Sequence, residues 1–454
     1  MAMAIVGFLA EAASGGDLLA ARQQMALSLG WHIVVASFGV AFPIFILLAE
    51  WRGTRGDEDA MELARRWSKT FAVLFAVGAV SGTILSFELG MLWPGMVGTF
   101  GDVWGLPFAI EGVAFFLEAI FLGIYLYGWD RFSAKAHLAV GLPIPVAGAA
   151  SAFIVVTANA WMNHPTGFDA ATYAATGRVI AVDPWAAMFN RGTPVQGIHM
   201  ILAALMVGGF AVSSVYAWAW LRGRRDRRHQ LGFVIPFVVG LAAAPVQVVV
   251  GDWAARFAYN HQPIKFAALE AVYETEAGAP LSIGGWVSGE QVRFALEIPG
   301  ALSWLATGDR DAVVVGLGGV PPDERPPVPV VRMAFQVMVG IGFLLVLAGA
   351  WFGVAWWRRR SPPVSRWFWR LAWVAGPLAA VALEAGWVVT ELGRQPWIVY
   401  QVMRIEEAVT PAPGIRVGFW VVTVAYTALT AATVFVLTRL GRSLRTLDVG
   451  GGDG

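Results

Sequence analysis

The sequence contains no cysteine, which excludes disulfide bonds, thiolate metal sites, iron–sulfur clusters and haem attached through cysteine. Any metal must therefore be held by histidine, methionine or carboxylate side chains. Charged residues are also scarce, at 14% of the 454 residues, whereas soluble domains carry about 25%. With 57% hydrophobic residues and a mean hydropathy of +0.62, the composition excludes an ordinary soluble protein and predicts a polytopic membrane protein.

Nine apolar runs are long enough to cross a bilayer, because a hydrocarbon core of about 30 Å requires roughly 20 helical residues at about 1.5 Å each. We therefore predict an all-α fold with nine transmembrane helices in a single membrane domain, residues 1–454. The predicted spans are residues 26–50, 70–93, 107–128, 137–162, 194–221, 230–252, 329–357, 368–392 and 415–438.

Lysine and arginine gather in alternate loops, those after the first, third, fifth, seventh and ninth spans. By the positive-inside rule these loops are cytoplasmic, so the N-terminus lies outside and the C-terminus inside. Residues 253–328, between the sixth and seventh spans, then form one long outer loop, and its length suggests a function. The basic residues are Arg52, Arg55, Arg65, Arg66, Lys69, Arg131, Lys135, Arg222, Arg224, Arg225, Arg227, Arg228, Arg358, Arg359, Arg360, Arg366, Arg439, Arg442 and Arg445.

Polar residues inside the spans are few, and each needs a partner or a function because a charge at the bilayer centre costs about 2.5–3.5 kcal/mol. Histidine and methionine are usual axial ligands of haem iron, so their presence at one depth predicts a haem site near the outer face. The alternative for a single histidine or methionine is a core residue with a packing role. The residues within one or two turns of the outer end are His32, His199, Met338, Glu88, Glu111 and Glu384.

Several motifs resemble subunit I of the cytochrome bd-type quinol oxidases, in the same order and from about Arg22 to Leu440. The most specific is GRQPW at 393–397 after EAGW at 384–387, and the resemblance implies that Arg394 and Trp397 help to bind the cofactors. The other motifs are AIEG at 109–112, FFLE at 115–118, GWDR at 128–131, ANAWM at 158–162 and KFAALE at 265–270.

The resemblance implies three haems. A low-spin haem b would have His199 and Met338 as axial ligands, whereas a high-spin haem b and a haem d would each be held from one side, by His32 and Glu384. Which of these two residues holds haem d stays open. The resemblance also implies a homologous second oxidase subunit or an identical copy as partner, allows a small single-span subunit, and places the protein in the bacterial cytoplasmic (inner) membrane.

The implied function is a quinol:oxygen oxidoreductase that oxidises quinol at the outer face and reduces dioxygen to water with cytoplasmic protons. It would be electrogenic without pumping protons. The quinol-binding loop of the family matches residues 253–328, where Glu270 is the candidate proton acceptor. Lys265 would donate to the quinol oxygen or pair with Glu270. The alternative is that Lys265 and Glu270 are solvated charges on a loop helix.

Glu111 and Glu118 share a helix face because they are seven residues apart. Such a pair can reflect helix packing, or it can pass protons from the cytoplasmic side towards the haems, with Glu118 the deeper member. Carboxylates buried in this way suit relay duty.

Two positions depart from the family pattern. Gln336 stands two residues before the methionine ligand, where the family has arginine, and the second span reads Ser86-Phe-Glu88, which moves a carboxylate by two positions. Two other functions are therefore considered. One is a divergent haem protein that moves electrons between quinone and a partner without reducing oxygen, and the other is a transporter that uses buried glutamates for proton coupling.

Overall fold

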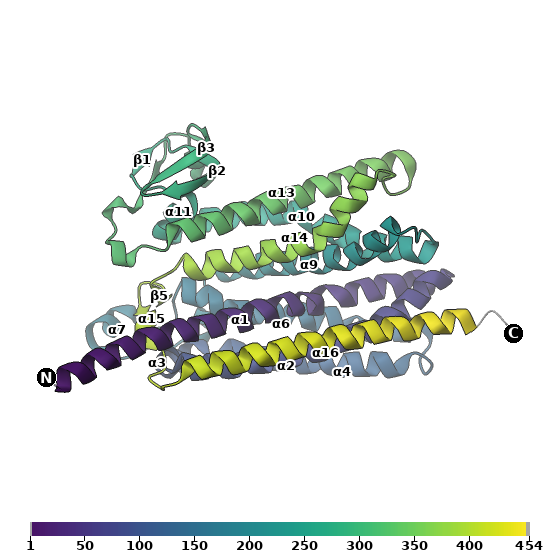
Figure 1. Cartoon of the computed structure of the whole chain (residues 1–454), viewed down its shortest axis with the longest axis horizontal. Helices are drawn as coiled ribbons and strands as arrows, with labels where there is room; N and C mark the ends of the chain where they lie inside the picture. The colour runs from purple at the N-terminus through teal and green to yellow at the C-terminus, as the bar shows by residue number, and fades with distance from the viewer. Residues whose placement is uncertain (1, 451–454) are drawn as a thin grey trace. The chain divides into compact units, whose positions relative to one another are not determined.

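The computed structural model describes the backbone of residues 2–450 and the side chains of residues 17–441 (Figure 1). Within this part the chain is mostly helical, and nine stretches are long and apolar enough to cross a membrane, which confirms the predicted number. They are Asp17–Gly53, Glu58–Leu92, Leu106–Gly128, Ala134–Asn163, Thr193–Leu221, Arg227–His261, Pro322–Arg359, Arg366–Leu392 and Ile415–Gly441.

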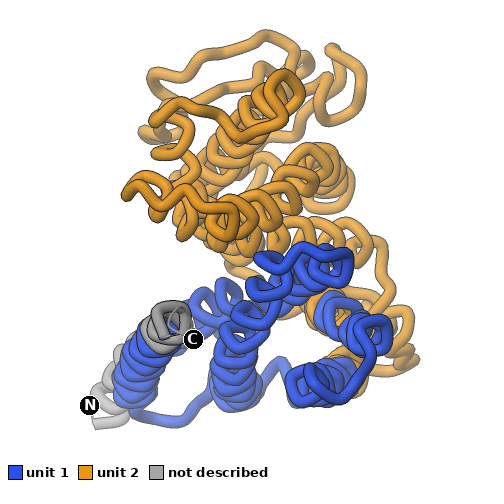
Figure 2. The backbone as a smooth tube through the Cα atoms, turned by 90° about the vertical axis from the view of Figure 1, so that its right-hand side faces the viewer, with its two compact units in different colours: residues 1–101, 113–149, 406–454 blue, residues 102–112, 150–405 orange. Residues whose placement is uncertain are grey.

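The chain divides into two compact units, which Figure 2 distinguishes by colour. Unit 1 comprises residues 1–101, 113–149 and 406–454, and unit 2 comprises residues 102–112 and 150–405. The shorter elements of the chain are α3 (Pro94–Trp104), α7 (Ala170–Thr176), α8 (Pro184–Met188), β5 (Trp397–Val399), β6 (Met403–Arg404) and α15 (Ile405–Ala408).

Unit 1 is built around α1 (Ala2–Gly53), which packs against α2 (Glu58–Leu92), α5 (Ala134–Gly141) and α16 (Ile415–Gly450). The carboxylate of Asp57 begins α2 by accepting a backbone N–H of its first turn at 3.3 Å. Such a cap supplies one of the acceptors that the first turn of a helix lacks.

Three polar side chains of unit 1 form a buried cluster in which no member is more than 2% exposed. Glu50 lies in the last turn of α1, Tyr125 lies near the end of α4 (Leu106–Gly128), and His137 lies in α5. The Tyr125 hydroxyl donates to Glu50 Oε2 at 2.6 Å, and His137 Nδ1 lies 2.7 Å from Glu50 Oε1. Both carboxyl oxygens therefore have partners, which offsets the cost of their burial.

Unit 2 contains a bundle of four long helices in which each helix packs against two others. The order around the bundle is α9 (Thr193–Leu221), α10 (Arg227–His261), α13 (Val328–Arg359) and α14 (Arg366–Leu392), with α14 packed against α9. The helices α9 and α13 therefore occupy opposite corners. A Cβ atom at Gly209 of α9 would lie only 2.7 Å from a backbone oxygen of α10, so glycine permits this close contact.

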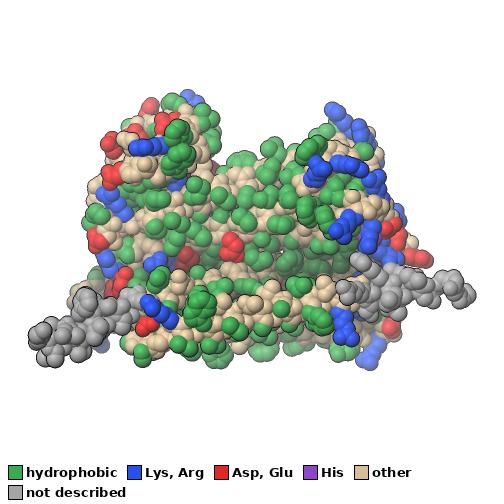
Figure 3. All heavy atoms as spheres, viewed as in Figure 1, with side chains coloured by type: hydrophobic (Ala, Val, Ile, Leu, Met, Phe, Trp, Pro, Cys, Tyr) green, Lys and Arg blue, Asp and Glu red, His purple; other side chains and the backbone are tan. Residues whose placement is uncertain are grey.

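Aromatic rings fill the end of the bundle at which α13 is connected to α14. Phe233, Phe237, Phe352, Phe368 and Trp369 contact one another with ring centroids 4.6–6.2 Å apart. Figure 3 shows Lys and Arg side chains gathered at the same end of unit 2. We call it the basic end, and it carries the exposed residues Arg222, Arg224, Arg225, Arg358, Arg359 and Arg360. Membrane orientation remains a prediction, and the side chains of Arg442 and Arg445 lie outside the described residues.

The segment between α10 and α13 forms a small layer at the opposite end of the bundle. It starts with α11 (Pro263–Glu270) and continues into a hairpin of β2 (Leu281–Ser288) and β3 (Gln291–Ile298), paired from Leu281 with Ile298 to Ser288 with Gln291. The prediction of an all-α chain is wrong for this segment. Glycines at 284, 285 and 289 adopt positive φ there, which bends β2 and closes the turn. The remaining elements are β1 (Glu276–Ala277), α12 (Ala301–Thr307), β4 (Val313–Val314) and two short 3₁₀ helices, Leu317–Gly319 and Pro322–Glu324.

The buried cluster of unit 1 generates a test of stability. Replacing Tyr125 by Phe removes the hydroxyl that donates to Glu50, and a buried acceptor left without its partner costs about 1–3 kcal/mol. We expect Tyr125→Phe to lower the melting temperature in detergent by several degrees. Tyr127→Phe is the matched control, because that side chain is 78% exposed on the same helix. Equal melting temperatures for the two variants would contradict the role of the cluster.

Candidate functional site

The bundle of unit 2 carries the two predicted axial ligands on opposite corner helices. His199 lies in the second turn of α9, and Met338 lies in the third turn of α13. A Cβ atom at Gly251 of α10 would lie 3.8 Å from His199 Cε1, and one at Gly386 of α14 would lie 3.0 Å from Met338 Sδ. The two flanking helices thus carry glycine beside the histidine and the methionine, where a Cβ atom would come into contact with each side chain.

Several buried polar atoms of the bundle have no hydrogen-bond partner among the described residues. Two of them are Nδ1 of His199 and Oε1 of Glu384, which lies on α14 two residues before Gly386, and others are Oε1 of Gln247 and Nε of Arg332. Buried polar atoms are nearly always hydrogen-bonded, so an exception needs an explanation such as a ligand. The sequence predicts His199 and Glu384 as haem ligands, whereas it predicts no such role for Gln247 or Arg332.

His32 lies on α1 in unit 1 and has a hydrogen-bond partner on α2. Its Nδ1 is 2.8 Å from the Ser81 hydroxyl, which donates its own proton to the carbonyl oxygen of Gly78 at 2.9 Å. Ser81 can therefore only accept, so His32 Nδ1 carries the hydrogen and Nε2 has a lone pair available for a metal. A histidine held through its second nitrogen is the usual arrangement for a metal ligand.

The predicted carboxylates lie in different surroundings. Glu111 belongs to unit 2, where its Oε1 accepts from the Ser151 hydroxyl at 2.9 Å. Glu118 belongs to unit 1 and is 4% exposed, and a Cβ atom at Gly148 would lie 3.1 Å from its Oε1. Glu88 of unit 1 accepts from a glutamine of α1 at 3.0 Å. Glu88 and Glu118 are thus buried between helices, and Glu111 is partly buried.

Lys265 is buried on α11, at 6% exposure, and it does not pair with Glu270. Its Nζ donates to Asn163 Oδ1 at 2.8 Å and to the carbonyl oxygen of Thr390 at 3.3 Å. Burial, the largest cause, and the nearby cation Arg394 together lower the pKa of Lys265 to about 7, against the opposing effect of Glu391. The interpretation of Lys265 as a solvated loop charge is therefore wrong.

Glu270 ends the same helix and is 8% exposed, so it is not a solvated charge either. Burial raises its pKa to about 7, although the guanidinium of Arg332 opposes this shift. The Arg332 Nη1 atom lies 3.9 Å from Glu270 Oε2, and this oxygen has no hydrogen-bond partner among the described residues. A carboxyl group with a pKa near neutrality can accept and release protons at physiological pH.

Asparagine residues connect Lys265 to the helices of the bundle, and the sequence analysis missed them. Asn163 Nδ2 donates to the carbonyl oxygen of Asn159 at 2.9 Å, and Asn159 Nδ2 donates to Gln196 of α9 at 3.1 Å. Arg394, 3% exposed, donates to Asn159 Oδ1 at 3.2 Å. The ANAWM motif at 158–162 contained one of these asparagines, and its polar residue among apolar neighbours was the available signal.

Arg332 was also missed, although an arginine four residues into the predicted span 329–357 was a signal. Gln336, where the family pattern has arginine, accepts the N–H of Gly284 in β2 at 3.1 Å. The neutral amide therefore holds the hairpin.

Trp397 pairs with Arg404 between β5 and β6. The guanidinium carbon of Arg404 lies 5.3 Å from the centre of the Trp397 ring.

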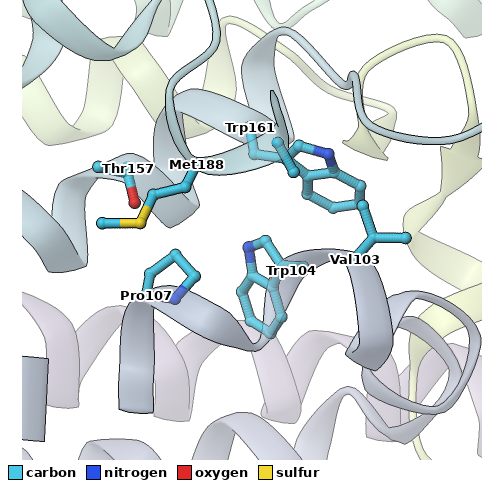
Figure 4. A pocket seen from close by; sticks show the side chains of 7 residues that line it. Val103, Trp104, Pro107, Thr157, Trp161 and Met188 are labelled. Atoms are coloured by element: carbon cyan, nitrogen blue, oxygen red, sulfur yellow. The ribbon is translucent and has the colours of Figure 1, made fainter. Parts of the chain in front are cut away.

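A separate small pocket of unit 2 contains no ionisable side chain among its lining residues. In Figure 4 Met188 and Thr157 lie on one side of it, and the rings of Trp104 and Trp161 lie on the other. Both indole nitrogens donate to backbone oxygens, at 3.2 and 2.8 Å. The pocket offers no group for redox or proton chemistry. Its lining is Val103, Trp104, Pro107, Thr157, Trp161, Ala187 and Met188.

Comparison with known proteins identifies the family to which the chain belongs. The family described as cytochrome bd terminal oxidase subunit I matches residues 20–444. A putative cytochrome bd menaquinol oxidase subunit I from Bacillus subtilis (strain 168) is 37% identical over 93% of this chain and 96% of its own. A cytochrome bd ubiquinol oxidase subunit 1 from the same organism is 30% identical over 93% of each chain.

A solved structure gives the same result. The bd oxidase from Geobacillus thermodenitrificans superimposes with a TM-score of 0.86 and 37% identity, covering 94% of this chain and 98% of that one. The family match and the relatives extend over nearly all of the sequence. The chain therefore belongs to the cytochrome bd terminal oxidase subunit I family.

Proposed function

We propose that this quinol oxidase subunit oxidises quinol at the outer face and reduces dioxygen to water with protons from the cytoplasm. The family match over residues 20–444 is the observation that carries the proposal. The relatives from Bacillus subtilis are described as menaquinol and ubiquinol oxidases, which supports a quinol as substrate. Two quinols supply four electrons and release four protons outside, and one dioxygen takes up those four electrons with four cytoplasmic protons to form two water molecules.

The residues of the bundle fit a low-spin haem b. His199 and Met338 lie on opposite corner helices, and glycines of the other two helices lie beside them. Bound haem supplies iron that carries single electrons and, where one axial position is open, reduces dioxygen. We assign His32 and Glu384 as single protein ligands of a high-spin haem b and a haem d, without assigning either residue to haem d. Arg394 and Trp397 are proposed to support the cofactors.

We assign quinol oxidation to α11 within the outer loop, residues 253–328. Glu270 accepts a proton from the quinol hydroxyl, because its Oε2 has no protein partner and its pKa lies near neutrality. Lys265, held by Asn163, donates a hydrogen bond to the second quinol oxygen. Because its pKa is about 7, Glu270 can then release that proton outside at neutral pH.

The proton route to the haems runs along α4. Glu118 passes protons to Glu111, seven residues away and therefore about 10 Å along the helix at about 1.5 Å per residue. Protons taken from the cytoplasm and quinol oxidised outside together generate a membrane voltage without a pump. The remaining proposals are a homologous second subunit or an identical copy, possible room for a small single-span subunit, and location in the bacterial inner membrane.

The first test is spectroscopic. We expect the purified oxidase to show a low-spin haem b and a chlorin-type haem d, which absorbs further to the red than haem b. His199→Ala and Met338→Leu should each remove the low-spin signal while the protein stays in the membrane, because each removes one of two axial ligands. An unaltered low-spin spectrum in both variants would refute the ligand assignment. A spectrum with haem b alone would favour an electron-transfer protein that does not reduce oxygen.

The second test concerns Glu270. Replacing it by Gln keeps the shape of the side chain but removes the proton acceptor, so quinol-driven oxygen consumption should fall at least about tenfold. Oxygen consumption driven by an artificial one-electron donor that bypasses the quinol site should stay near the wild-type rate. Equal losses with both donors would indicate misfolding or a role at the haems.

The third test concerns Glu118. Glu118→Gln removes the titrating group, so oxygen reduction and the voltage, negative inside, that sealed vesicles build should both fall at least about tenfold. Haem content and reduction by quinol should stay near normal. Glu118→Ala should be at least as damaging, because neither variant carries a proton.

A packing role for Glu118 makes a different forecast, since Gln is nearly isosteric with Glu. It requires that only the Ala variant loses activity, through the space left beside Gly148. Full turnover and full voltage in Glu118→Gln would refute the relay.

A further inference from the structure

Arg332 is a fully buried arginine at the start of α13, with 2% of its surface exposed. Its guanidinium donates to three backbone carbonyl oxygens of the outer loop. Nη1 bonds Glu270 at 2.8 Å, and Nη2 bonds Ser282 at 2.9 Å and Gly284 at 3.0 Å. One side chain thus connects the end of α11 to strand β2.

The second partner of the hairpin lies one turn further along α13. Gln336 Oε1 accepts the N–H of Gly284 at 3.1 Å, and its Nε2 lies 3.4 Å from the carbonyl oxygen of Ser282. Gly284 and Gly285 both have positive φ, near 70°, so the bend of β2 at this contact depends on glycine. The hairpin is therefore attached to α13 through its own backbone atoms, so this attachment does not depend on the exposed side chains of the hairpin.

Arg332 is the charged group that faces the Glu270 carboxyl, with its Nη1 at 3.9 Å from Oε2. Three elements pack against α11: α10, α13 and the 3₁₀ helix Leu317–Gly319. The 3₁₀ helix has no ionisable side chain, and Asp252 and Arg256 of α10 bond each other at 2.8 Å. The other ionisable groups at this end include His261, in the last turn of α10, and Tyr259, whose ring packs against Phe266 of α11. Lys265, Tyr273 and Glu274 flank Glu270 along the chain.

We propose that Arg332 is a positioning residue for quinol oxidation, which holds α11 against the hairpin and keeps the Glu270 carboxylate ionised as the proton acceptor. A fixed positive charge within about 4–6 Å favours the ionised form of a carboxyl group. The three carbonyl bonds determine where that charge lies, because they use both Nη atoms of the planar guanidinium. The inference rests on the proposed role of Glu270 in the oxidase.

The alternative is that Arg332 only anchors the loop. Both roles predict a slower enzyme when the arginine is replaced, so the rate alone does not separate them. The pH dependence of the rate separates the two roles, because an anchor has no effect on the pH at which Glu270 loses its proton.

The experiment measures kcat/KM for a short-chain quinol from about pH 5.5 to 9, with the complete oxidase in membranes. In Arg332→Gln the carboxyl loses its neighbouring charge, so its proton is held more tightly and the acidic limb moves to higher pH, by about one unit. Below the limb this equals about a tenfold lower kcat/KM. Arg332→Lys keeps the charge, so its limb should stay within a few tenths of a unit of wild type even though its rate falls.

Arg325→Gln is the matched control, because Arg325 holds the same loop through Val320 and Glu290 but does not face Glu270. Its limb should match wild type. A uniform loss at every pH in Arg332→Gln, with the limb unmoved, would overturn the inference in favour of an anchor. A limb displaced equally in Arg332→Lys would overturn the claim that the charge keeps Glu270 ionised. If Arg332→Gln does not assemble, Arg332→Met supplies the uncharged variant, and its limb is judged by the same criterion.

The failure of this inference is distinguishable from failure of the proposed function. If Glu270→Gln oxidises quinol at the wild-type rate, the proposed acceptor is wrong. If Glu270→Gln is inactive with quinol and Arg332→Gln keeps the wild-type pH profile, only the proposed role of Arg332 is refuted. Haem spectra and turnover with the artificial donor should be unchanged in Arg332→Gln and Arg325→Gln, since neither Arg332 nor Arg325 is proposed as a haem ligand.

Discussion

A polar atom without a partner is costly inside apolar helices, and this constraint governs where the chain places its few ionisable residues. At Glu50 the constraint is met in full, because Tyr125 and His137 occupy both carboxyl oxygens. The exceptions among the described residues include Nδ1 of His199, Oε1 of Glu384 and Oε2 of Glu270. Satisfied clusters stabilise the units, whereas His199, Glu384 and Glu270 are residues for which a haem or a quinol partner is proposed.

In the four-helix bundle, aromatic packing and the proposed haem ligands lie at opposite ends. Its basic end is packed with aromatic rings such as Phe233 and Phe368, whose ring centroids lie 6.1 Å apart. The opposite end carries His199 and Met338, with glycine on the neighbouring helices. The outer loop then adds α11 and the hairpin to this end, so the proposed quinol residues and the proposed low-spin haem ligands belong to one unit.

Two buried arginines connect segments of unit 2 that are distant in sequence. Arg332 and Arg394 are both nearly fully buried, and each uses its planar guanidinium to hold two segments that are distant in sequence. Each also lies beside a residue proposed to handle quinol protons, Arg332 beside Glu270 and Arg394 beside Lys265. Burial moves the pKa values of the acid and the amine towards neutrality, and these cations adjust them further.

The sequence by itself determined the nine spans, because hydrophobic length depends only on local composition, and it indicated the haem-ligand candidates through polar residues in apolar runs. The motif resemblance to the family was likewise local. Only the tertiary structure decided that Lys265 pairs with Asn163 instead of Glu270, and that Arg332 and Gln336 attach a β-hairpin to α13. These contacts join residues some 50 to 100 positions apart, and no local pattern encodes which distant carbonyl or amide a buried side chain will meet.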